Sequence, residues 1–117
     1  MAIILTARAP AEYTQDLKES PLTQPPQSVL TYAIDVSAIG TPTGSPGITV
    51  YNRLNGNDAT SIVCSGGASI NASNQIEFDL EGLLSSNNYL CVITFTVTGT
   101  GAPYTVRMIV RCDNDGI

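Results

Sequence analysis

The residues best suited to chemistry are three carboxylates that alternate along one segment. Glu77, Asp79 and Glu81 are spaced two apart, so on a β-strand their side chains would share one face. A close pair of carboxylates can act as general acid and general base. The apolar residues Phe78 and Leu80 lie between them, however, which is typical of a strand with one wet face. We therefore interpret these carboxylates as a solvated strand face rather than a catalytic pair.

Other reactive groups lack the partners that catalysis requires. The chain has no His to activate its many Ser and Thr hydroxyls, and Lys18 is its single lysine. The segment Asp113-Asn114-Asp115-Gly116 resembles the start of a calcium loop but lacks the downstream Glu. The sequence thus predicts that the protein is not an enzyme and that it has no cofactor and no metal site.

The cysteines point to a reducing environment. Cys64, Cys91 and Cys112 are an odd number, and no two have the C-x-x-C spacing of metal or redox sites. We expect three reduced, partly buried thiols.

Charge and hydropathy exclude further classes of protein. Five basic and ten acidic residues give the 117-residue chain a net charge of −5, which argues against a nucleic-acid partner. No apolar run approaches the ~20 residues of a membrane-spanning helix, so we expect no membrane partner. The first charge, Arg8, follows the short apolar start rather than preceding it, so we predict no signal peptide and expect synthesis in the cytosol.

The elements that must position these residues are strands, because the apolar pattern has a period of two from residue 28 onward. The alternating segments are 28–37, 47–53, 75–80, 89–98 and 104–112, with a further short strand near 61–64. About seven short strands separated by Gly, Pro and Asn turns predict an all-β fold, an immunoglobulin-like antiparallel β-sandwich over residues 28–117.

Three aromatic residues are expected to be structural. Tyr32 and Phe95 fall on inward positions of their strands. Tyr89 precedes the inward Cys91 by two residues and follows a polar loop, which is where a tyrosine corner would lie.

Residues 1–27 fall outside the alternating pattern and are predicted to form an extended, Pro-containing N-terminal arm. A helical turn near 11–18 is compatible with Pro10 at its start, and 19–27 should run extended. Ile3, Ile4 and Leu5 are candidates to add a strand to a neighbour's sheet edge. Alternatively, residues 2–6 are the first strand of the same domain, and the sequence leaves both readings open.

The few charges separate when they are placed on the expected strands. Asp35, Glu77 and Asp79 would lie on the outer face of one sheet, and the arginines on the outer face of the other. These basic residues are Arg53, Arg107 and Arg111. An acidic and a basic face are candidate partner-binding surfaces, for neighbouring copies or for another protein.

The segment Pro26-Gln-Ser-Val-Leu-Thr-Tyr-Ala-Ile-Asp-Val-Ser37 resembles the opening strand of small immunoglobulin-like virion proteins of tailed bacteriophages, in particular fibre–tail adaptors. A Leu-x-Gly-Leu motif, an Asn-Asn-Tyr strand and a closing Thr/Val/Arg strand extend the resemblance over residues 26–112.

The resemblance implies a non-enzymatic structural protein of the virion, assembled in the host cytoplasm. It would join tail or baseplate to fibres through its arm and sheet faces, as a homo-oligomer contacting other virion proteins. The alternative is a head decoration (cement) protein that bridges neighbouring capsid subunits. A carbohydrate-binding module fits less well, because the chain has no Trp and Tyr51 is its one clear outward strand aromatic.

Overall fold

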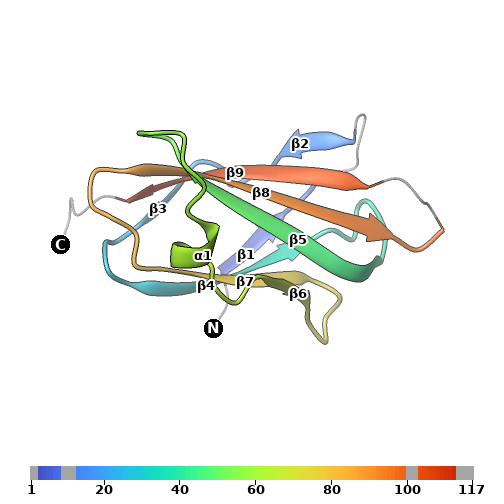
Figure 1. Cartoon of the computed structure of the whole chain (residues 1–117). Coiled ribbons are helices and arrows are strands. Elements are labelled where there is room, and N and C mark those ends of the chain that lie inside the picture. Colours follow the sequence, from blue (N-terminus) through green and yellow to red (C-terminus); the bar gives the residue numbers. More distant parts are fainter. Residues whose placement is uncertain (1–2, 9–12, 100–102, 113–117) are drawn as a thin grey trace.

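The computed structural model describes residues 3–8, 13–99 and 103–112, which form two sheets packed face to face (Figure 1). The lower layer in Figure 1 has the strand order β1-β4-β7-β6 and the upper layer β2-β9-β8-β5, with β3 also paired to β9. The bounds in the lower layer are β1 Ile3–Thr6, β4 Val29–Asp35, β6 Ala68–Ile70 and β7 Ile76–Glu81. Those in the upper layer are β2 Thr14–Asp16, β3 Leu22–Gln24, β5 Pro42–Asn52, β8 Asn88–Val97 and β9 Tyr104–Cys112.

The predicted all-β sandwich is confirmed, and so is its division into two sheets. β4 pairs with β7 in one sheet, and β5, β8 and β9 pair in the other. These central pairs are antiparallel, as expected. The sheets are nevertheless mixed, because β1 pairs with β4, and β2 and β3 pair with β9, in parallel.

The alternation in the sequence correctly predicts the buried face of the long strands. Every second side chain of β7, β8 and β9 faces the other sheet, and most of those side chains are almost fully buried. Tyr32, Tyr89 and Phe95 are all in this core, as predicted. The ring of Tyr32 stacks on Phe78, with centroids 5.6 Å apart.

The predicted N-terminal arm is wrong for the described part of residues 1–27. This region contributes β1, β2 and β3, which lie at sheet edges beside β4 and β9 rather than outside the sandwich. Leu5 and Leu17 are fully buried in the common core. The period-two pattern did not reveal strands of three or four residues, and the free edges of β4 and β9 supply the backbone partners that such short strands need.

Three further local predictions differ from the structure. The expected helical turn near 11–18 is instead β2 in its described part, and the short strand expected at 61–64 is instead a helical turn, α1 (Thr60–Val63). Asp58 accepts hydrogen bonds from the backbone and hydroxyl of Thr60, which starts that turn locally. β5 begins at Pro42, earlier than expected, and its pairing with β8 shifts register between Thr43 and Gly47, where a bulge accommodates Pro46.

Cys64, Cys91 and Cys112 are buried thiols that form no disulfide with one another, as predicted. Burial raises the pKa of the Cys91 thiol, so this group stays protonated and unreactive at neutral pH. In the part of the chain that the structure describes, no helix has the length and hydropathy needed to cross a membrane.

Candidate functional site

The outer side of the β5-β8-β9 sheet carries an apolar centre bordered by arginines. The strand register places Tyr51, Leu90 and Ile109 in one row across the sheet. Val92 lies in the next row, beside Arg107. We call this surface the basic face, and its residues are Tyr51, Arg53, Leu90, Val92, Arg107, Ile109 and Arg111.

The arginines of the basic face are available for contacts. Arg107 Nε lies 3.2 Å from Asp16 Oδ1, and both side chains are largely exposed, so this pair contributes little to stability. No ion pair of Arg53 or Arg111 occurs among the residues that the structure describes, and both residues are exposed. As predicted, Arg107 and Arg111 of β9 are exposed, and Arg53 is exposed directly after the end of β5.

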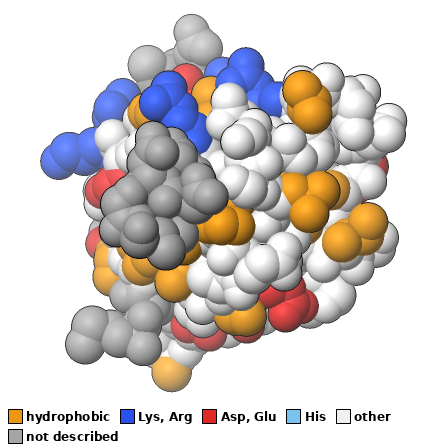
Figure 2. Space-filling model, turned by 90° about the vertical axis from the view of Figure 1, so that its left-hand side faces the viewer, with side chains coloured by type: hydrophobic (Ala, Val, Ile, Leu, Met, Phe, Trp, Pro, Cys, Tyr) orange, Lys and Arg blue, Asp and Glu red, His pale blue; other side chains and the backbone are white. Residues whose placement is uncertain are grey.

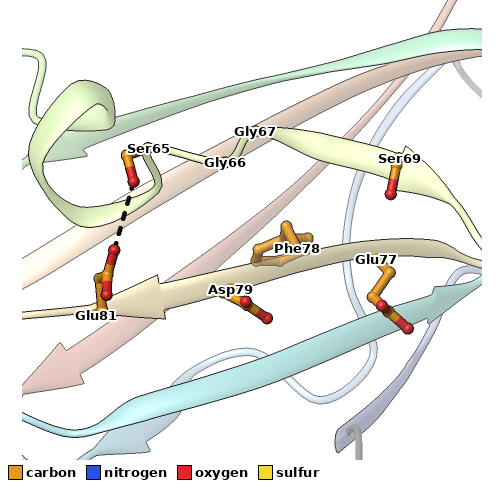
Figure 3. A pocket seen from close by; sticks show the side chains of 8 residues that line it. All are labelled: Ser65, Gly66, Gly67, Ser69, Glu77, Phe78, Asp79 and Glu81. Carbon is orange, nitrogen blue, oxygen red and sulfur yellow. Dashed lines mark hydrogen bonds between the residues drawn. The ribbon is translucent and has the colours of Figure 1, made fainter.

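The outer side of the β4-β7 pair carries the carboxylates. Glu77, Asp79 and Glu81 follow one another along β7, and Asp35 ends β4. With the exposed Val29 and the partly exposed Thr31 of β4, these residues form what we call the acidic face. Figure 3 shows the three β7 carboxylates in file beside the loop at Ser65–Gly67, where they line a groove of about 290 Å³.

Hydrogen bonds hold several of these carboxylates in place. Asp79 accepts from the Thr31 hydroxyl at 2.6 Å, across the β4–β7 ladder. Glu77 accepts from the Asn71 amide at 3.2 Å, and Glu81 from the Ser65 hydroxyl at 3.4 Å. The carboxylate of Asp35 accepts from Ser37, and these hydrogen bonds keep the pKa of Asp35 below its usual value.

The two faces therefore lie on opposite sides of the sandwich and carry opposite charge. Figure 2, which views the molecule from one end, shows most Lys and Arg side chains in the upper part and most Asp and Glu side chains lower down. Since the upper layer is the β9-β8-β5 sheet, the predicted charge separation is present in the fold.

Ile3, Ile4 and Leu5 pair within their own chain, since β1 lies in register with Tyr32–Ile34 of β4. Leu5 is buried, whereas Ile4 points outward and is half exposed. The free edge of β1 is partly closed, because the Thr6 N–H donates to Glu19 Oε1 at 2.6 Å and the Thr6 carbonyl accepts from the Lys18 N–H at 3.1 Å. The structure thus favours the reading in which residues 2–6 belong to the same domain, for the described residues 3–6.

Sequence reasoning missed a buried polar bridge between the sheets. Gln24 of β3 is fully buried; its Nε2 donates to the Leu80 carbonyl at 2.9 Å, and its Oε1 accepts from the Tyr32 hydroxyl at 2.8 Å. Burial also raises the pKa of Tyr32, so this donor keeps its proton. A glutamine in a Pro-rich segment gives no signal of such a role, because its partners are distant in sequence.

Tyr89 makes the contact expected of a tyrosine corner. Its hydroxyl accepts a hydrogen bond from the Leu84 N–H at 3.1 Å, five residues upstream. The bond fixes the loop that enters β8 and so orients the start of the basic face.

An apolar groove at the end of the sandwich also escaped the sequence analysis. It has a volume of about 340 Å³ between the Asn52–Ala59 loop, α1 and the Gly82–Leu84 turn. Ile62 and Leu84 line it. Leu54 belongs to the same Asn52–Ala59 loop but is not part of the lining; Leu54 is 76% exposed and Ile62 72%. Figure 2 shows hydrophobic side chains emerging among polar ones on this end. The groove is formed largely by loop residues, and hydrophobic periodicity in the sequence does not indicate how loops pack.

The described titratable groups are buried, hydrogen-bonded within the fold, or at least partly exposed, and the exposed Arg8 and Lys18 lie outside the two faces. Within the described ranges, no cluster of three or more His, Cys, Asp or Glu side chains could hold a metal ion. The predicted calcium-loop resemblance at 113–116 lies outside the described residues. No family model matches this chain, and no curated protein matches it either.

Proposed function

We propose that this protein is a non-enzymatic structural module that acts by docking its sheet faces onto partner proteins. The observation that carries the proposal is the opposite charge of the two outer faces, one with Arg53, Arg107 and Arg111 and the other with Asp35 and the β7 carboxylates. Complementary charge at exposed faces favours specific protein contacts and fixes their register. The exposed apolar groove at the end of the sandwich supports the same role, since such patches mark interaction sites.

The setting we propose is the virion of a tailed bacteriophage, as an adaptor between tail or baseplate and fibres. The resemblance of residues 26–112 to such proteins supports it, as does the sandwich architecture. Docking would proceed through the sheet faces and not through a free N-terminal arm, because the described N-terminal residues are strands of the fold.

The test is to locate the protein in purified particles by cryo-electron microscopy, with mass spectrometry to establish its presence. Density for the sandwich at the tail or baseplate is the expected result. Density on the capsid surface would favour the head decoration alternative. Absence from purified particles, with the protein found only in soluble host fractions, would overturn both virion roles.

A further inference from the structure

The two faces match each other in charge and in spacing. Arg107 and Arg111 are four residues apart on one face of β9, and Glu77 and Glu81 are four residues apart on one face of β7. Four residues of extended strand span about 13 Å, so both pairs have the same separation. A β9 strand aligned along a β7 strand would therefore place both arginines opposite both glutamates.

The residues between these pairs are also compatible. Ile109 lies between the arginines and Asp79 between the glutamates. The Thr31 hydroxyl donates to the Asp79 carboxylate at 2.6 Å, which offsets part of the cost of covering this charge with an apolar neighbour. Each face also exposes apolar surface near its charges, through Tyr51 on the basic face, 39% exposed, and Val29 on the acidic face, 61% exposed.

We propose that the basic face binds the acidic face of a second copy of this chain, so that copies associate head to tail. This inference deepens the proposed docking function and rests on it, since it names the partner of the basic face. Each copy presents both faces on opposite sides, so the contact is heterologous and repeats along a stack or closes into a ring.

The size of the basic face sets the strength of the contact. Three strands of about nine residues cover roughly 14 by 30 Å, or about 400 Å². Stable complexes bury about 800 Å² on each partner, so a single contact is weak and becomes effective where copies are held in a repeated array. The experiment therefore uses concentrated protein.

Two charge-reversed variants test the contact. Arg107→Glu/Arg111→Glu gives the basic face a net negative charge. Glu77→Lys/Glu81→Lys keeps Asp35 and Asp79 but places two lysines where the alignment requires acidic partners for the two arginines. At about 0.5 mM, sedimentation velocity should show self-association of the unmodified protein, and each variant alone should associate at least about tenfold more weakly. An equimolar mixture of the two variants should regain association. Both variants keep a negative net charge, so non-specific attraction cannot produce this recovery.

A matched control distinguishes an effect of the basic face from an effect of the net charge of the protein. Arg8→Glu/Lys18→Glu reverses two exposed cations outside the basic face and changes net charge by the same amount as the β9 variant. It should associate like the unmodified protein. Far-UV circular dichroism checks the fold of each variant. If Glu77→Lys disturbs folding, Glu81→Lys alone replaces the pair, because Glu81 is exposed and lies opposite an arginine in the proposed alignment.

A mixture that stays monomeric, or single variants that associate like the unmodified protein, would overturn the head-to-tail contact. That result would leave the proposed docking function standing if the particle map shows the chain seated on a different protein. Absence from the particle combined with recovery in the mixture would overturn the virion setting and leave the head-to-tail contact standing, so the two proposals can fail separately.

Discussion

The described N-terminal region, residues 3–8 and 13–27, and the later strands are held in the sandwich by different means. β8 and β9 have ten and nine residues and share a long antiparallel ladder, whereas β1, β2 and β3 have four, three and three. A long ladder stabilises itself through many backbone hydrogen bonds and a continuous buried face. A three-residue strand has neither advantage.

Side chains compensate in the N-terminal region. Glu19 accepts from the Thr6 N–H at the edge of β1, and Ser20 Oγ accepts from the Ile109 N–H at 3.0 Å, in the gap between β2 and β3. Gln24 then connects β3 to the opposite sheet. The short edge strands are therefore held in place by specific polar side chains, whereas the long central strands are held by their backbone ladder and by the alternation of buried and exposed residues.

The largest effect should come from removing the N-terminal region. Deletion of residues 1–27 takes away the buried side chains of Leu5 and Leu17, each worth about 1.5–3 kcal/mol, and uncovers the edges of β4 and β9. Since total stability is of order 5–15 kcal/mol, we expect loss of cooperative unfolding in thermal circular dichroism. A truncated protein that still unfolds cooperatively would show that the N-terminal strands are dispensable and would remove the basis of the comparison.

A smaller effect is expected at the bridge between the sheets. Gln24→Ala removes the side chain that bonds the buried Tyr32 hydroxyl and the Leu80 carbonyl, which should lower the free energy of unfolding by about 1–3 kcal/mol in urea denaturation. Gln15→Ala is the matched control in the same region, since among the described residues the Gln15 side chain bonds only the backbone of Arg8 near the surface, and it should cost under about 0.5 kcal/mol. Equal effects of the two substitutions would contradict a special role for the buried amide.

In the later strands, loss of a single side-chain hydrogen bond should lower the free energy of unfolding only slightly, because the backbone ladder between the strands remains. Tyr89→Phe removes the acceptor of the Leu84 N–H and should cost about 1 kcal/mol in the same denaturation experiment. Tyr51→Phe, on the exposed outer face, should leave stability unchanged. A loss at Tyr89 larger than that at Gln24 would show that the later strands also depend on single side chains.

The smallest effect should be a pH-dependent one at the end of β4. The pKa of Asp35 is lowered in the folded protein, so its charge contributes stability above its unfolded pKa of about 4, and this contribution disappears as pH falls through the lower folded value. Asp35→Asn should therefore cost a few tenths of a kcal/mol at pH 7, since the group is largely solvated. Its unfolding curve should merge with that of the unmodified protein at about pH 2. A difference that persists at low pH would mean that the charge is not its cause.

The sequence predicted best those strands in which apolar and polar residues alternate over a long stretch. β7, β8 and β9 were predicted within a residue or so, and their buried sides were correct, because alternation over six to ten residues is specific for a strand with one wet face. The outer charges followed, since a residue's face is fixed once its strand is placed. β6 and the helical turn α1 could not be predicted from the sequence, because three or four residues are too few to show the hydrophobic periodicity of a strand or a helix.

The local residue pattern was sufficient to predict the all-β class, the buried rows of the long strands, the position of the tyrosine corner at Tyr89, and the opposite charge of the two outer faces. Each of these depends on local alternation or on a short motif. Only the tertiary structure decided that the N-terminal region belongs to both sheets, that Gln24 bridges them, and that an apolar groove opens at one end. The physical reason is common to all three: their bonding and packing partners lie far away in the sequence, and only the packed sheets bring them together.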